Sequence, residues 1–291
     1  MEDNILENQL FEILYNKDMP EHIKLAKVDM LISLGVDVNA MYGIYSALHI
    51  AKKEKLEKVA EFLSDNNAKD LVDEKNRNEY GKKLMDACAK PKSNIEEIKT
   101  LINMGADINY KNDLGMTAMM RASHMNNGDV VDFLISNGAD IDAQDKDGFT
   151  ALAVAVRYDS VSVAKILLDK GAKLDVKINN NKGKTLLITA AEWAAPEIVD
   201  MLIKYGEKVN VADDEGNTAL MFASKRGSPT IIKTLVMNKA DVYKKNKSGE
   251  TAIDLAYDDN IKWVIIEEVT NRNKLSKDAF MKKVKDVFSI R

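Results

Sequence analysis

Histidine, cysteine and acidic side chains are the residues of this sequence that could form a catalytic or metal-binding site. The number and spacing of the histidines and of the cysteine argue against such a site. The three histidines, His22, His49 and His124, lie far apart, and no two of them have the spacing of a metal-binding pair. Cys88 is the single cysteine, which excludes both a multi-thiolate site and an intramolecular disulfide. We predict that its thiol is buried and inert.

Acidic residues offer a second candidate, because the tract Asp213-Asp214-Glu215 and the pair Asp258-Asp259 could supply general acids and bases or cation ligands. However, acidic residues precede glycines at regular intervals along the chain, and exposed turns accept them at little cost. The glycines never cluster as they do in a phosphate-binding loop. No nucleophile elbow, HExxH motif or P-loop is present. We therefore predict a protein that is not an enzyme and that uses no metal or cofactor.

A unit of 33 residues, clearest in residues 112–144, organises the chain. Gly115 is predicted in a turn, Thr117 is the predicted N-cap of a short helix, and Ala122 lies on the inner face of that helix. A second, amphipathic helix follows. Gly138 stands just past its end, where a left-handed C-cap conformation favours glycine.

The same series returns along the chain after 33, 35, 33 and 33 residues. The turn glycines that mark these copies are Gly148, Gly183, Gly216 and Gly249. Self-similarity at a nearly fixed period indicates a repeat architecture. The two extra residues of the longer interval are expected in the loop around residues 178–181.

Short motifs recur at matching places in these units. They are GMTAM at 115–119, GxTAL at 148–152 and 216–220, and a closing GADI at 105–108 and 138–141. On these motifs the chain resembles the ankyrin-repeat family, and several copies in register argue against a chance match. The resemblance implies an all-α ankyrin-repeat solenoid, in which helix-loop-helix repeats are joined by β-hairpin-like connections.

The chain departs from the Thr-Pro-Leu-His box of that family. The proline place holds Ala118, Ala151, Leu186, Ala219 and Ala252. The histidine place holds Met120, Ala153, Ile188, Met221 and Asp254. Alanine is a strong helix former and is harmless there. Loss of the histidine removes a side chain that the family uses for hydrogen bonds between repeats, so we expect the stack to depend more on apolar contact.

The expected organisation is a single elongated domain over residues 1–291 with about eight repeats, because a repeat array needs no single large core. Residues 1–40 are interpreted as a divergent N-terminal capping repeat and residues 41–257 as the repeat array. Residues 258–291 are interpreted as C-terminal cap helices.

The last part of that segment, residues 275–291, has the pattern of a basic amphipathic helix. Phe280, Val284, Val287 and Phe288 share one face, with lysines opposite. A terminal repeat must cover its exposed apolar side, which favours a cap. A helix for a membrane surface or for a partner's groove is the alternative.

Composition gives little reason to expect a nucleic-acid or membrane partner. Charged residues make up 30% of the sequence, but they are interspersed and the net charge is −4. The N-terminal segment lacks the pattern of a signal peptide, and no apolar run approaches the ~20 residues of a membrane-spanning helix. We expect a monomeric, cytoplasmic protein that binds another protein, although a removed leader and secretion stay open.

The predicted partner site follows from the architecture, since stacked repeats form an extended concave face. In ankyrin-like folds the resemblance implies that hairpin tips and the outer side of each first helix build this face. The residues predicted to bind the partner are Leu114, Met116, His124, Met125, Phe149, Arg157, Tyr158, Lys184, Glu192, Trp193, Lys225 and Arg226. Several are apolar where the repeat pattern requires no apolar group, and an apolar patch rimmed by charge usually marks an interface.

Three functions are compatible with this surface. The first is a non-catalytic scaffold or adaptor, whose partner segment of mixed charge is held at its centre by the aromatic residues. The second is a groove for a small molecule or nucleotide, with Trp193 or Tyr158 stacking on a ring and Lys184, Lys225 or Arg226 holding phosphate. The third is a secreted effector that acts on another organism's proteins.

Overall fold

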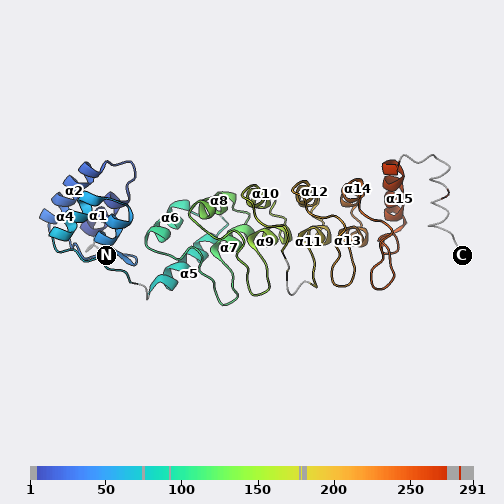
Figure 1. The fold of residues 1–291 in the computed structure, drawn as a ribbon, viewed down its shortest axis with the longest axis horizontal. Helices are drawn as coiled ribbons and strands as arrows, with labels where there is room; N and C mark the ends of the chain where they lie inside the picture. Colours follow the sequence, from blue (N-terminus) through green and yellow to red (C-terminus); the bar gives the residue numbers. More distant parts are fainter. Residues whose placement is uncertain are drawn as a thin grey trace. The chain divides into compact units, whose positions relative to one another are not determined.

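The structure is a computed structural model that describes residues 5–73, 76–91, 93–176, 178, 182–273 and 282 (Figure 1). The chain divides into two compact units. Unit 1 comprises residues 1–87 and 93–110, and unit 2 comprises residues 88–92 and 111–291.

Unit 1 is built from helix pairs and one short hairpin. Its elements are α1 (Ile5–Tyr15), α2 (Glu21–Ser33), β1 (Met41–Tyr42), β2 (Tyr45–Ser46), α3 (Ala47–Lys53), α4 (Glu57–Asp65), α5 (Arg77–Cys88, whose last residue belongs to unit 2) and α6 (Ile95–Asn103). The antiparallel strands pair Met41 with Ser46 and Tyr42 with Tyr45. Leu10, Leu14 and Leu63 are fully buried in one apolar core.

Unit 2 contains two rows of helices, visible in Figure 1. The first helices of successive repeats are α7 (Ala118–His124), α9 (Ala151–Arg157), α11 (Leu186–Glu192) and α13 (Ala219–Arg226). The second helices are α8 (Gly128–Ser136), α10 (Val161–Asp169), α12 (Pro196–Lys204), α14 (Pro229–Met237) and α15 (Asp259–Asn273). Each helix packs against the next helix of its own row as well as against its partner within the repeat.

Threonine side chains begin all four of the first helices of unit 2. The hydroxyl oxygens of Thr117, Thr150, Thr185 and Thr218 each accept the backbone N–H of the residue three positions on, at 3.2–3.4 Å. This confirms the N-cap predicted from the repeat pattern. Ser228, by contrast, lies at the N-cap of α14 without a side-chain hydrogen bond to the helix.

Methionine at the third helix position forms a weak hydrogen bond in two of the repeats. The sulfur atoms of Met120 and Met221 accept the backbone N–H groups of Thr117 and Thr218, at 3.4 Å in both repeats. A thioether is a weak acceptor, so the gain in stability is small. The bond also stays within one repeat, and neighbouring repeats are joined by other groups.

Hairpins precede the first helices, and one Asn or Asp organises each hairpin that the structure describes fully in unit 2. The Oδ1 atoms of Asn112, Asp145, Asp213 and Asn246 each accept two backbone N–H groups, from the residues two and four positions on, at 2.7–3.0 Å. Such bonds fix a turn without regular secondary structure. Asp213, one of the candidate acid or base groups, is therefore buried and used to shape a turn.

Backbone hydrogen bonds join neighbouring hairpins. They run from Lys146 N to Leu114 O at 3.0 Å, from Asp214 N to Lys182 O at 2.8 Å and from Lys247 N to Glu215 O at 2.9 Å. Gly115 allows the first of these contacts. Its φ is +79°, and a Cβ atom there would lie 2.8 Å from the backbone nitrogen of Lys146. The turn glycine thus serves both the hairpin and the junction with the next repeat.

The last repeat of unit 2 has a turn in place of a first helix. Residues 252–255 form this turn, and α15 follows directly. Asp254 Oδ2 accepts the backbone N–H of Thr251 at 2.8 Å and its hydroxyl at 2.7 Å. A short acidic side chain that bonds to nearby backbone competes with helix formation, which explains the departure from the regular pattern. The helix predicted over 275–291 lies outside the described residues, apart from Lys282.

Glu207 is an acidic residue at a place that other repeats give to alanine. The matching residues of other repeats are Ala106, Ala139, Ala172 and Ala240, of which Ala139 is half-buried and the other three are buried. Burial raises the pKa of the Glu207 carboxyl to about 7, and the nearby Asp175 also raises it. Hydrogen bonds from the Thr185 side chain and the Leu187 backbone act in the opposite direction. The charged form of Glu207 therefore opposes folding.

Replacing Gly115 by alanine should destabilise unit 2 more than the same change at Gly138. Both glycines have a positive φ, but nothing lies within 4 Å of a Cβ atom added at Gly138. We expect about 1–3 kcal/mol for Gly115→Ala, and only the backbone strain of about 1 kcal/mol for the control Gly138→Ala. Urea denaturation followed by circular dichroism measures both, and equal costs would contradict the role of the close approach.

Replacing Glu207 by glutamine should stabilise the protein in a pH-dependent way. The unfolded carboxyl ionises near pH 4.5 and the folded one near 7, so wild-type stability falls as the pH rises through this window. The Glu207 side chain is partly exposed, which reduces the effect. We expect the difference in unfolding free energy between Glu207→Gln and wild type to increase by about 1–2 kcal/mol from pH 4.5 to pH 8. Thermal denaturation at the two pH values tests this, with the exposed Glu61→Gln as control. A difference that does not change with pH would refute it.

Candidate functional site

The candidate site lies where the first helices of unit 2 end. The C-cap residues of α7, α9 and α11 are Met125, Tyr158 and Trp193. In all three the next residue has a positive φ, at Asn126, Asp159 and Ala194, which turns the chain toward the second helix. Because this geometry repeats, the C-cap side chains occupy matching places in successive repeats.

Arg157 is surrounded by aromatic rings at this place. Its guanidinium carbon lies 5.4 Å from the centroid of Phe149, 5.8 Å from that of Tyr158 and 5.9 Å from that of Trp193. The ring of His124 packs against Tyr158 with centroids 4.1 Å apart. We call these five residues the Arg157 cluster. The structure thus brings together five of the twelve residues predicted to bind a partner.

The cluster is ordered by contacts but remains open to solvent. Tyr158 and Trp193 are 51% and 52% exposed. A cation over an aromatic ring within about 6 Å is attracted by roughly 0.5–1 kcal/mol at an exposed site and by about 2 kcal/mol or more when water is excluded. A partner that covers the cluster would therefore strengthen these contacts as well as bury the rings.

Two further predicted residues, Lys184 and Glu192, pair with each other. Lys184 Nζ lies 2.8 Å from Glu192 Oε1 and 2.7 Å from Oε2, and the side chains are 13% and 24% exposed. The same ammonium group lies 4.8 Å from the centroid of the Phe222 ring. Lys184 is thereby committed to an internal pair and to holding Phe222 in place.

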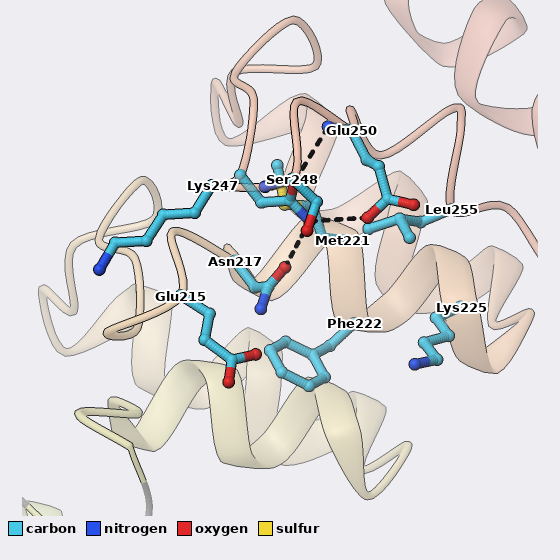
Figure 2. A pocket seen from close by; sticks show the side chains of 10 residues that line it. Glu215, Asn217, Met221, Phe222, Lys225, Lys247, Ser248, Glu250 and Leu255 are labelled. Atoms are coloured by element: carbon cyan, nitrogen blue, oxygen red, sulfur yellow. Dashed lines mark hydrogen bonds between the residues drawn. The ribbon is translucent and has the colours of Figure 1, made fainter.

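A pocket of about 230 Å³ opens beside α13, between two hairpins (Figure 2). It is lined by Glu215, Asn217, Met221, Phe222, Lys225, Asn246, Lys247, Ser248, Glu250 and Leu255. Lys225 is the only predicted binding residue among them. Lys184, which lies over Phe222, connects this pocket to Glu192 and hence to the neighbouring Trp193.

The remaining predicted residues lie outside the Arg157 cluster. Leu114 is 63% exposed at a hairpin tip, and Arg226 is exposed at the last position of α13. Met116 and Met125 are partly buried.

Phe222 is the most important residue that the sequence prediction missed. It stands four positions after the N-cap, where the other repeats have Arg121, Val154, Thr189 and Leu255. Such different residue types at one repeat position indicate that stacking does not fix the side chain there. That variation within the chain was the available signal.

Comparison with known proteins places the chain in a family. A sequence profile for ankyrin repeats (3 copies) matches residues 84–178 and 174–246, more than half of the sequence. The chain belongs to the ankyrin-repeat family, and its helices confirm the predicted all-α repeat solenoid.

A particular solved structure is similar as well. It is titled as the Bd0816 predatory endopeptidase from Bdellovibrio bacteriovorus in complex with immunity protein Bd3460. The matching chain is 31% identical with a TM-score of 0.55, and the match covers 69% of this chain and 97% of that one. No curated protein matches this sequence significantly.

Other features bear on the predicted chemistry. Cys88 is buried, as predicted. Within the described parts of the chain, no three His, Cys, Asp or Glu side chains gather as a metal site requires. Over the same residues, no helix combines the length and the hydropathy needed to cross a bilayer.

Removing the Lys184 ammonium group should cost more stability than removing that of Lys182. Lys184→Met leaves the partly buried Glu192 carboxylate unpaired, whereas the matched pair Lys182–Glu215 is exposed, at 66% and 55%. We expect a loss of about 1–3 kcal/mol for Lys184→Met and a clearly smaller loss for Lys182→Met, whose pair is screened by water. Urea denaturation of both variants provides the comparison, and a Lys184→Met variant as stable as wild type would show that the pair does not support the surface.

Proposed function

We propose that this chain is a non-catalytic protein-binding module whose partner lies across the ends of the first helices of unit 2. The observation that carries the proposal is the Arg157 cluster, in which a guanidinium group is held among three rings while two of those rings stay half exposed. Repeat stacking does not require large apolar groups at these positions. Membership of the ankyrin-repeat family supports binding of another protein.

The residue types of the cluster suit a binding hot spot. Trp, Tyr and Arg are the residues that most often dominate the energy of protein–protein interfaces. Their contacts with one another limit the rotamers available before binding, so less conformational entropy is lost when a partner covers them.

The geometry favours a protein over a small molecule or nucleotide. Ligand pockets usually enclose about 300–1,000 Å³, and the pocket that contains Lys225 is smaller, at about 230 Å³. A second pocket, of about 330 Å³, is lined by Glu207 and Val211 and contains none of the residues predicted to hold a ligand. Lys184, a candidate for holding phosphate, is engaged by both carboxylate oxygens of Glu192. Cytoplasmic location, a monomeric state and the lack of nucleic-acid or membrane partners stay predictions.

A second candidate function is to bind an endopeptidase as an immunity protein. The similar structure contains an immunity protein in complex with an endopeptidase, and 97% of the matching chain aligns with this one at 31% identity. Titration of the purified endopeptidase Bd0816 with this protein, with hydrolysis and calorimetry as readouts, tests this candidate. Inhibition would support it, while absence of binding would reject that partner and leave the general proposal unchanged.

Truncating the cluster should remove partner binding without unfolding the protein. We expect Arg157→Ala and Trp193→Ala each to weaken binding by about 2 kcal/mol or more, roughly thirtyfold in Kd. The measurement is capture of the partner from a lysate of the native source with identification by mass spectrometry, followed by Kd values for the purified pair. Tyr243→Ala is the matched control, because Tyr243 is 59% exposed but lies outside the cluster. Unchanged capture by both cluster variants would reject the site.

A further inference from the structure

We propose that the pocket beside α13 binds a carboxylate of the partner, so that the segment crossing the Arg157 cluster is an acidic one. This inference rests on the proposed function and specifies the chemistry of the partner. It replaces the segment of mixed charge that the sequence suggests.

The acidic groups at this surface are already satisfied within the protein. Glu215 pairs with Lys182 at 2.6 Å, and Glu250 Oε2 accepts a hydrogen bond from Asn246 Nδ2 at 3.1 Å. Glu192 is held by Lys184. Lysines therefore balance the charges of Glu215 and Glu192, whereas Glu250 is bonded by a neutral amide and keeps its negative charge.

The basic groups are in excess. Lys225 and Lys247 line the pocket, and no hydrogen bond or ion pair between described residues engages the ammonium group of either. The pKa of the Glu215 carboxyl is lowered, first by the hydrogen bond and charge of Lys182 and further by the charges of Lys184 and Lys247. Among the described residues, the Arg157 guanidinium group contacts aromatic rings and no carboxylate. The charges of Arg157, Lys225 and Lys247 outnumber that of Glu250, so the charge that remains from the cluster to the pocket is positive, which favours an anionic partner.

The lining of the pocket matches one aliphatic side chain that ends in a carboxylate. Phe222, Met221 and Leu255 supply apolar surface, and Figure 2 shows Lys225 to one side of the Phe222 ring and Lys247 extending away from the ring on the other side. A volume of about 230 Å³ is too small for most whole ligands but is suited to a single inserted side chain such as glutamate.

The pocket is also held in shape before any partner binds. Asn246 Nδ2 donates to Asn217 Oδ1 at 2.9 Å and to Glu250 Oε2, while Asn246 Oδ1 accepts the backbone N–H groups of Ser248 and Glu250 (Figure 2). On the other side, the Lys184 ammonium group lies over the Phe222 ring. Pre-ordered walls reduce the entropy lost on binding.

The pocket and the cluster form one path along unit 2. Arg157 contacts Trp193, the preceding Glu192 pairs with Lys184, and Lys184 covers Phe222 at the pocket. The helices that carry these residues, α9, α11 and α13, pack in that order. A partner segment that covers the rings therefore reaches the pocket within the same surface.

An array of short synthetic peptides, each with one aromatic residue and either Glu, Gln or Lys downstream, provides the test. The purified full-length protein should be retained by Glu peptides more than by Gln peptides, and least by Lys peptides. For the best Glu peptide, the double variant Lys225→Glu/Lys247→Glu should raise Kd at least about tenfold. Added salt should weaken wild-type binding.

The control Lys165→Glu/Lys208→Glu changes the net charge equally at exposed sites away from this pocket, so its Kd should stay within about twofold of wild type. Thermal denaturation confirms that each variant is folded. If Arg157→Ala and Trp193→Ala weaken peptide binding but Lys225→Glu/Lys247→Glu does not, this inference is overturned and the proposed function is left intact. Binding indifferent to all four residues, or retention of no peptide, would overturn both.

Discussion

The backbone hydrogen bonds between neighbouring hairpins are the constraint on which the surface of unit 2 depends. They hold each hairpin against the next through main-chain atoms, so their geometry does not vary with side-chain identity. Glycine at the turn allows the two neighbouring hairpins to lie close enough for these bonds, as at Gly115. With the hairpins in register, the helices that follow them start and end in register too, and their C-cap residues form a continuous row.

Acidic and basic residues play different parts on this framework. The turn-forming Asp145 and Asp213 satisfy backbone N–H groups inside their own hairpins, and Glu192 and Glu215 pair with lysines. An almost balanced overall composition therefore conceals a surface with unpaired positive charge. Net charge describes the chain as a whole, whereas recognition depends on which charges remain without an internal partner.

The sequence was sufficient to predict the repeat fold, whereas the partner surface stays a prediction. Period, helix pairs, threonine N-caps and the aromatic excess at Tyr158 and Trp193 all follow from local spacing, because a repeat fixes where each Cα lies. Side-chain partners do not follow from spacing. The pairing of Lys184 with Glu192 and the ring contacts of Arg157 depend on rotamers chosen by neighbouring repeats. Similarly, Asp254 bonds to Thr251 where a helix pattern continues in the sequence.

Because of Glu207, the contacts between neighbouring repeats of unit 2 are not all equally stable. In a linear array each repeat is held only by its neighbours, so total stability is the sum of the junctions and the weakest junction opens first. A carboxylate that must lose water to occupy an alanine's place weakens the junction beside α11 once it ionises. Above neutral pH, the free energy that joins the repeats on either side of Glu207 is therefore expected to be lower, and amide hydrogen exchange around α11 should become faster than it is at pH 5.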